Sequence, residues 1–155
     1  MLNWPHVHLM INHFPVVGIM GVILLLAYAI VRKSEEVKMV TLGVIVLLAL
    51  MTIAVYLTGQ AAEDTVKKLP GVMEASIGRH EEVADLSLIL MEASGIVALA
   101  GLFLTRRRGV MPKWFVSLVL ILSLVTAVIV GYTANLGGEI RHSEIREPNA
   151  VFPSH

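Results

Sequence analysis

The chain has 155 residues, of which 56% are hydrophobic and 15% are charged, and its formal net charge is zero. Soluble domains carry about 25% charged residues, so this composition is typical of an integral membrane protein, and the neutral charge argues against a nucleic acid partner. The absence of cysteine excludes disulfides, iron–sulfur clusters, covalently attached c-type haem and cysteine-ligated zinc.

Four apolar runs are long enough to cross a lipid bilayer, which takes roughly 17–25 residues in an α-helix. They cover residues 14–31, 39–58, 86–105 and 114–132. A loop at 59–85 joins the second run to the third, and a polar tail at 133–155 follows the fourth. The segment before the first run lacks the basic region of a signal peptide, so that run is expected to remain as a span. The sequence predicts an all-α integral membrane four-helix bundle that forms one transmembrane domain over 1–155.

Positive charge is densest in the two short links at 32–38 and 106–113. Lys and Arg in short loops near span ends mark the cytoplasmic side of a membrane protein. Both termini and the loop at 59–85 are therefore expected to face away from the cytoplasm.

The two halves of the chain resemble each other faintly. The second span ends with the sequence TGQAAE at 58–63, and the fourth ends with the similar sequence TANLGGE at 133–139. Each half opens with a histidine, His13 or His80. A duplicated helical hairpin would give a pseudo-two-fold bundle whose histidine-bearing helices begin at the same face.

The histidines all lie near one predicted end of the bundle. They are His6, His8, His13, His80, His142 and His155. Imidazole is the commonest protein ligand for metals and a usual axial ligand of haem iron, so this grouping indicates a cofactor or metal site at the extracytoplasmic face. Counting about 1.5 Å per helical residue places His8 and His80 at similar heights. By the same count His142 lies slightly higher and His13 one to two turns deeper, and a kink at Pro15 would shift the first helix.

His8 and His13 are five residues apart, or about 140° around a helix, so both would not chelate one ion. That spacing favours ligands drawn from different helices, as in bis-histidine haem held inside a bundle. Arg79 and Arg141 lie at the same face and are expected to pair with haem propionates. The candidate ligands, for haem or for a metal ion, are His8, His13, His80 and His142.

Acidic residues provide a second candidate function. Glu81, Asp85 and Glu92 are spaced by four and seven residues and so line one stripe of the third span. Glu92 lies well inside the apolar run, where an ionisable side chain is costly, so we expect it to face the bundle interior and to be neutral or paired. It is a candidate for carrying protons or for binding an ion together with His13. The alternative is a protonated Glu92 that hydrogen-bonds to a neighbouring helix.

Residues 8–15, with the sequence HLMINHFP, resemble the opening H-P-x-x-x-H-F-P of a widespread family of small bacterial four-helix membrane proteins. Gly59 and His80 match a glycine after the second span and a further histidine at the third that recur in this family. Leu9 stands where the family usually has proline. Some relatives are fused to cytochrome-c-like domains. The resemblance implies a protein of the bacterial inner membrane with a redox role, and haem b bound by the histidines at positions 8, 13 and 80. His142 is added from its height alone.

Hydrolytic chemistry is not indicated by the sequence. It has no nucleophile–base arrangement and no phosphate loop, and Ala84 stands where the zinc-protease motif H-E-x-x-H would need its second histidine. The sequence therefore favours a membrane haem b-binding electron carrier, or a subunit of a larger redox complex, over a stand-alone enzyme. Paired histidines would hold one or two haems near the extracytoplasmic face. The expected partners are a c-type cytochrome, quinone or other membrane redox subunits.

Two rival interpretations stay open. The first is a zinc- or copper-binding or transport protein, since mixed imidazole and carboxylate ligands suit these ions. Its ligand set would be His8, His80, Glu63, Glu139 and His142. The second is a structural subunit, in a homo- or hetero-oligomer, whose polar end docks a partner.

Overall fold

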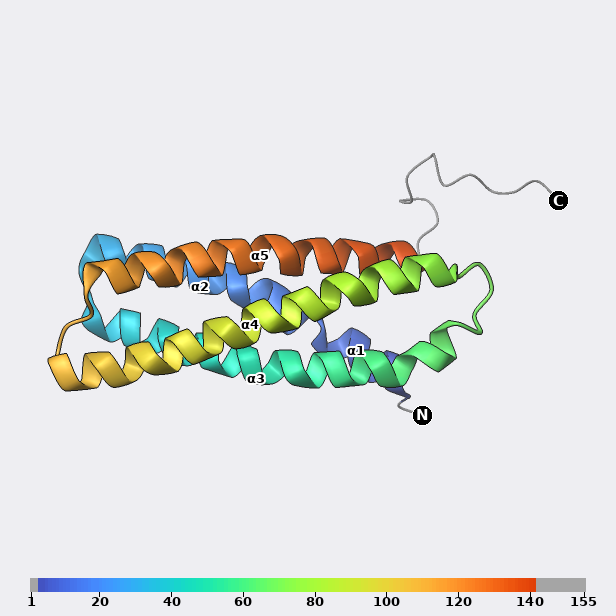
Figure 1. Cartoon of the computed structure of the whole chain (residues 1–155), viewed down its shortest axis with the longest axis horizontal. Helices are drawn as coiled ribbons and strands as arrows, with labels where there is room; N and C mark the ends of the chain where they lie inside the picture. The colour runs from blue at the N-terminus through green and yellow to red at the C-terminus, as the bar shows by residue number, and fades with distance from the viewer. Residues whose placement is uncertain (1–2, 142–155) are drawn as a thin grey trace.

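The computed structural model describes residues 3–141, with Arg141 described by its backbone alone. This part of the chain is built from helices and contains no strand. The helices are α1 (Trp4–Ile11), α2 (His13–Arg32), α3 (Glu35–Val66), α4 (Glu74–Arg108) and α5 (Lys113–Arg141). Figure 1 shows them lying lengthwise in an elongated bundle, which confirms the predicted all-α class.

Within the described residues, four helical segments are long and apolar enough to cross a membrane, the first being α1 and α2 together. Large apolar side chains such as Val17, Leu24 and Val128 are exposed on the outside of the bundle, each by about two thirds. Lipid is the surroundings in which such a surface is stable, since water would solvate it poorly. The structure thus has four long apolar helices packed together, as expected of a membrane helical bundle.

The bundle has two chemically different ends. The links after α2 and after α4 lie together on the left of Figure 1. We call this end the basic end, because Lys and Arg residues cluster at the helix ends beside both links. The starts of α1 and α4 and the link after α3 lie at the opposite end. We call that end the histidine end.

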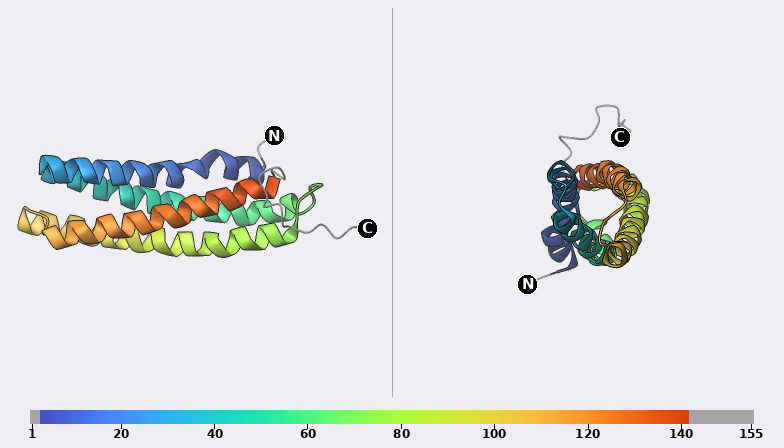
Figure 2. Two further views of the ribbon diagram at one scale, coloured as in Figure 1. Left: turned by 90° about the horizontal axis from the view of Figure 1, so that it is seen from above. Right: turned by 90° about the vertical axis from the view of Figure 1, so that its left-hand side faces the viewer.

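Each long helix packs against two others. Helix α2 contacts α3 and α5, and α4 contacts the same two helices, so the four close a ring that Figure 2 shows end-on. Its interior is filled by buried side chains that include Ile19, Leu42 and Met91. Small hydroxyl side chains also occur there, as in the contact between Ser94 Oγ and Thr126 Oγ1 at 3.2 Å.

Helices α3 and α4 extend further toward the histidine end than the apolar runs predict. Helix α3 continues to Val66 and α4 begins at Glu74, so the loop expected at 59–85 shrinks to 67–73. The tail expected from 133 is likewise helical as far as Arg141. Hydropathy marks where a helix leaves the hydrocarbon core, whereas a helix continues through polar residues as long as its backbone groups stay paired.

The first span is broken into two helices near its start. Helix α1 ends at Ile11, α2 begins at His13, and Asn12 stands between them. Pro15 has no N–H to donate to the carbonyl four residues earlier, and its ring crowds that carbonyl, which belongs to Ile11. The kink expected from Pro15 is therefore found one turn earlier, where α1 ends at Ile11. Beyond the break, α1 packs against α3 and, unlike α2, makes no close approach to α5.

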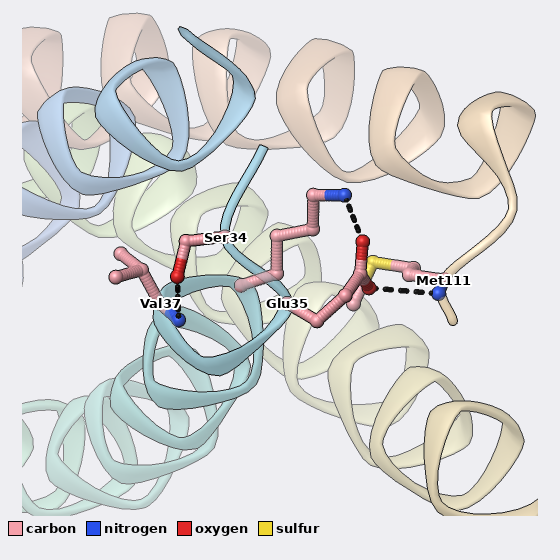
Figure 3. A network of polar contacts seen from close by, with 5 residues as sticks. Ser34, Glu35, Val37 and Met111 are labelled. Atoms are coloured by element: carbon pink, nitrogen blue, oxygen red, sulfur yellow. Dashed lines mark hydrogen bonds and ion pairs between the residues drawn. The ribbon is translucent and has the colours of Figure 1, made fainter. Parts of the chain in front are cut away.

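Glu35 ties the two halves of the chain together at the basic end (Figure 3). Its Oε1 accepts a hydrogen bond from Lys38 Nζ at 2.6 Å, and its Oε2 accepts one from the backbone N–H of Met111 at 2.9 Å. Ser34 caps the start of α3, where its Oγ accepts a bond from the backbone N–H of Val37 at 3.2 Å. The contact with Met111 fixes the start of α3 to the link between α4 and α5.

Candidate cofactor site at the histidine end

The imidazole of His8 packs against α3. Its Nδ1 lies 3.0 Å from the carbonyl oxygen of Val55 and 3.4 Å from the hydroxyl oxygen of Thr58. The ring lies against Gly59, where an added Cβ would be 3.1 Å from His8 Cε1. Such a contact is tighter than side chains normally make, so glycine is the residue that gives this ring its room.

The imidazole of His80 makes the same contacts with α5. Its Nδ1 lies 3.0 Å from the carbonyl oxygen of Thr133, and a Cβ at Gly137 would be 3.1 Å from His80 Cε1. In both halves the accepting carbonyl stands four residues before the glycine. One ring-holding arrangement thus occurs twice, as a duplicated hairpin would give. The counterpart of His80 in this repeat is His8, not His13 as the sequence pattern indicated.

The carbonyl contacts determine which nitrogen of each ring is available as a ligand. A carbonyl oxygen accepts hydrogen bonds but donates none, so each Nδ1 carries the proton and each Nε2 keeps a lone pair. Proteins commonly fix metal-binding imidazoles in this way, with a bond at one ring nitrogen setting the tautomer and orientation for the other. The rings of His8 and His80 are both half-buried and lie at the same end of the bundle. The structure therefore anchors two of the four predicted ligands in the same way at this end.

A second layer of hydrogen bonds supports the His80 half. Thr133 Oγ1 lies 2.7 Å from Ser87 Oγ and 2.9 Å from the carbonyl oxygen of Ile129. The residue whose carbonyl holds His80 is therefore itself bonded to α4. Sequence reasoning missed Ser87, Thr133 and Val55, and the equal four-residue step to each glycine is the signal that would have found the two acceptors.

The structure does not place His13 with this pair. His13 is exposed, and its Nδ1 lies 3.3 Å from the carbonyl oxygen of Leu9, one turn earlier. The break after Ile11 separates it from α1, which carries His8 onto α3. His142 and the side chain of Arg141 lie outside the described part of the chain.

Arg79 lies beside a shallow cleft between α4 and α5. Its Nη2 is 3.4 Å from the hydroxyl oxygen of Tyr132, and Glu82 lines the same cleft. The guanidinium of Arg79 therefore lies at the same level of the bundle as His80, the next residue in the chain.

The carboxylates of the zinc or copper interpretation have other partners. Glu63 accepts a hydrogen bond from Lys67, and that bond raises the pKa of the Lys67 ammonium group. Glu139 Oε1 accepts a bond from Asn135 Nδ2 at 2.8 Å. Among the described residues, no group of three or more His, Asp or Glu side chains is placed to hold a metal ion.

The acidic stripe on α4 faces α3. Asp85 Oδ1 accepts a hydrogen bond from the hydroxyl of Tyr56, on α3, at 2.7 Å. Glu92, further along the stripe, has a buried Oε1 that finds no hydrogen-bond partner within residues 3–141. An ionisable group in such a position inside a membrane bundle calls for a functional explanation.

Four membrane-length helices closed into a ring, with two anchored imidazoles at one end, define the chain as a multi-pass helical membrane protein. Residues 5–144 match the family described as predicted membrane protein (DUF2231), and the chain belongs to that family. The matched region contains His8 and His80 together with their glycines. No curated protein and no solved structure matches the chain.

Proposed function

We propose that this protein is a membrane haem b-binding electron carrier, or the haem-bearing subunit of a larger redox complex. The observation that carries the proposal is the paired anchoring of His8 and His80, on separate helices, through Nδ1 to a backbone carbonyl. Two imidazoles that present Nε2 would together hold a haem iron. Non-covalent haem needs no cysteine, which agrees with the composition.

Haem would supply the one-electron chemistry, and the residues of this chain would set its conditions. The carbonyls of Val55 and Thr133 hold the imidazoles in the ligand tautomer and strengthen them as electron donors. Packing against Gly59 and Gly137 fixes the position of each ring. Arg79, at the same end of the bundle, suits a pairing with a propionate group.

We infer that the histidine end faces the periplasm of a bacterial inner membrane, because the clustered Lys and Arg lie at the other end. Electrons would then pass between an extracytoplasmic donor, such as a c-type cytochrome, and quinone or a membrane redox subunit. His13 and His142 stay candidates for a second haem.

Single cysteines at Pro70 and Val110 test the orientation in intact cells. An impermeant reagent should label position 70 and not 110, and the reverse pattern would place the histidines at the cytoplasm.

Absorption spectra of the purified protein, oxidised and reduced, test the cofactor itself. Protein made with an ample haem supply should show a low-spin haem b spectrum, with the haem type verified as its pyridine haemochrome. His8→Ala and His80→Ala should each abolish the low-spin signal, because each removes one axial ligand. His6→Ala is the matched control, since His6 is exposed on the same helix as His8 and should leave the spectrum unchanged.

Two outcomes would contradict the cytochrome proposal. One is a folded but colourless protein, and the other is a haem spectrum that survives both substitutions. Metal analysis of the same samples then distinguishes the rivals: stoichiometric zinc or copper, lost in both variants, would favour the metal-binding protein. A folded protein with neither haem nor metal would favour the structural subunit.

A further inference from the structure

Polar side chains form a ladder along the contact between α3 and α4, starting at the histidine end. The hydroxyl of Tyr56 donates a hydrogen bond to Asp85 Oδ1 at 2.7 Å. Gln60 Nε2 donates in turn to the oxygen of Tyr56 at 2.9 Å. These three residues cross from one helix to the other, and Asp85 is exposed. The outer part of the ladder therefore meets water.

Glu92 lies further along the same side of α4, toward the middle of the membrane. It follows Asp85 by seven residues, which is two helical turns and about 10 Å of depth. Its Oε1 is buried and has no hydrogen-bond partner in the described part of the chain. The buried hydroxyl of Thr52, on α3, donates its hydrogen bond to the carbonyl oxygen of Leu48 at 2.8 Å.

Polar side chains along the contact between α3 and α4 end just beyond Glu92. A Cβ added at Gly95 would lie 2.7 Å from the Cβ of Ala49, so α3 and α4 approach too closely at that level for water to pass between them. Apolar side chains such as Leu42 and Ala98 fill the bundle on the basic side of this contact. Glu92 thus lies two helical turns from the polar groups at the histidine end and is closed off by packing from the basic end.

We propose that Glu92 is a proton-exchange site inside the membrane, reached from the histidine end through Asp85 and Tyr56. An ionised carboxylate without a partner is costly in this position, so the group gains and loses a proton instead of remaining charged. The step moves one proton from water at the histidine end to the Glu92 carboxylate and involves no electron transfer. The proposal requires water to bridge the two turns between Asp85 and Glu92.

The helices that flank α4 bring few other titratable groups toward this path. From α3 these are Tyr56, Glu63 and Lys67, the last of which follows the end of that helix. Tyr132 of α5 lies instead in the cleft between α4 and α5, beside Arg79. Glu81 and Asp85 are the ionisable neighbours on the same side of α4 itself. All of them lie nearer the histidine end than Glu92 does. The proposal is independent of the haem proposal, because none of its steps uses His8 or His80.

Infrared spectra of the full chain in lipid vesicles test the site directly. A protonated carboxylic acid in an apolar place gives a C=O stretching band clear of the amide bands. We expect such a band in the wild-type protein, its loss in Glu92→Gln, and its retention in Glu82→Gln, an exposed glutamate of the same helix. Glu92→Gln conserves the size of the side chain, and gel filtration checks that it folds.

Hydrogen–deuterium exchange of this band tests the path. After mixing with D₂O, Asp85→Asn and Tyr56→Phe should slow the shift of the band by about tenfold, which corresponds to an added barrier of about 1.4 kcal/mol. Tyr132→Phe and Glu82→Gln should exchange as the wild type does. Because this comparison uses the intact Glu92 group, it remains decisive even when Glu92→Gln fails to fold. An unchanged carboxyl band in folded Glu92→Gln, or equal exchange rates in all four variants, would overturn the proposal.

Discussion

The two hairpins of the bundle hold their histidines by the same contacts but on scaffolds of different stiffness. His80 stands on α4, an uninterrupted helix of 35 residues, whereas His8 stands on the eight-residue α1, which is separated from α2 by the break at Asn12. On the acceptor side, Thr133 is bonded to Ser87 of α4, while His8 gains only a longer contact of 3.4 Å with Thr58. The second hairpin is therefore the rigid half of the site.

This difference indicates how each half responds to change. Helix α1 has one large contact surface, against α3, and no close approach to α5, so it can shift as a unit without disturbing the ring of four long helices. Helix α4 packs against both α3 and α5 along its length and cannot shift in this way. We expect a substitution beside His80 to displace its ring fully. A substitution beside His8 should displace that ring less relative to its surroundings, because α1 can shift together with it.

Filling the glycine positions should give the largest difference between the halves. Gly137→Leu places a side chain where the His80 ring lies, and we expect the affinity for haem to fall at least about tenfold, or about 1.4 kcal/mol. Gly59→Leu should cost less, because α1 can move away from α3. Haem titration followed by absorbance measures both.

The controls for this comparison are Gly131→Leu on α5 and Gly43→Leu on α3, two glycines at which an added Cβ meets nothing within 4 Å. Both controls should bind haem as the wild type does. A larger loss in Gly59→Leu than in Gly137→Leu would reverse the assignment of the rigid half.

Removing the proline that breaks the first span should give the next largest effect. Pro15→Ala restores an N–H for the carbonyl of Ile11 and removes the crowding of that carbonyl, so the helix can continue through Asn12. A continuous first helix would draw His8 away from Val55, and we expect haem affinity to fall roughly fivefold, or about 1 kcal/mol. Pro112→Ala, at the basic end, is the control. Wild-type affinity in Pro15→Ala would show that packing against α3 alone holds α1 in place.

The four spans and the all-α class were predictable because bilayer-length apolar runs follow directly from composition along the chain. That His8 and His80 lie at one end of the bundle followed from counting helical rise, which converts sequence distance into depth, and their role as a ligand pair stays a prediction. The helix ends were not predictable from hydropathy, because α3 and α4 continue through polar residues such as Glu63 and Glu81.

Two features of the site depend on backbone geometry that the sequence pattern leaves open. The sequence groups His13 with the other candidate ligands because a helix break at Ile11, which changes the direction of the chain before it, cannot be located from Pro15 alone. The carbonyls of Val55 and Thr133 were missed because every residue offers a carbonyl. Only the packing of each ring against a glycine one turn further selects them.

The smallest difference is expected for the hydroxyl groups of Ser87, which contacts Thr133, and Thr58, which contacts His8. Ser87→Ala removes the shorter of two contacts between Thr133 and α4, at 2.7 Å, and leaves the one to the carbonyl of Val83 at 3.3 Å. We expect the free energy of unfolding to fall by about 0.6–1 kcal/mol, the usual range for such bonds. Thr58→Val removes the long 3.4 Å contact with His8, together with bonds of the same hydroxyl to the carbonyls of Ala54 and Val55 in its own helix. Bonds within one helix add little to its stability, so this change should cost only a few tenths of a kcal/mol. Ser117→Ala is the control, since that exposed hydroxyl bonds only to the carbonyl of Lys113 in its own helix. Unfolding in mixed detergent micelles, followed by circular dichroism, measures all three variants. If Thr58→Val proves as costly as Ser87→Ala, then the first hairpin is held as firmly as the second, and the difference between the halves lies in the helix break alone.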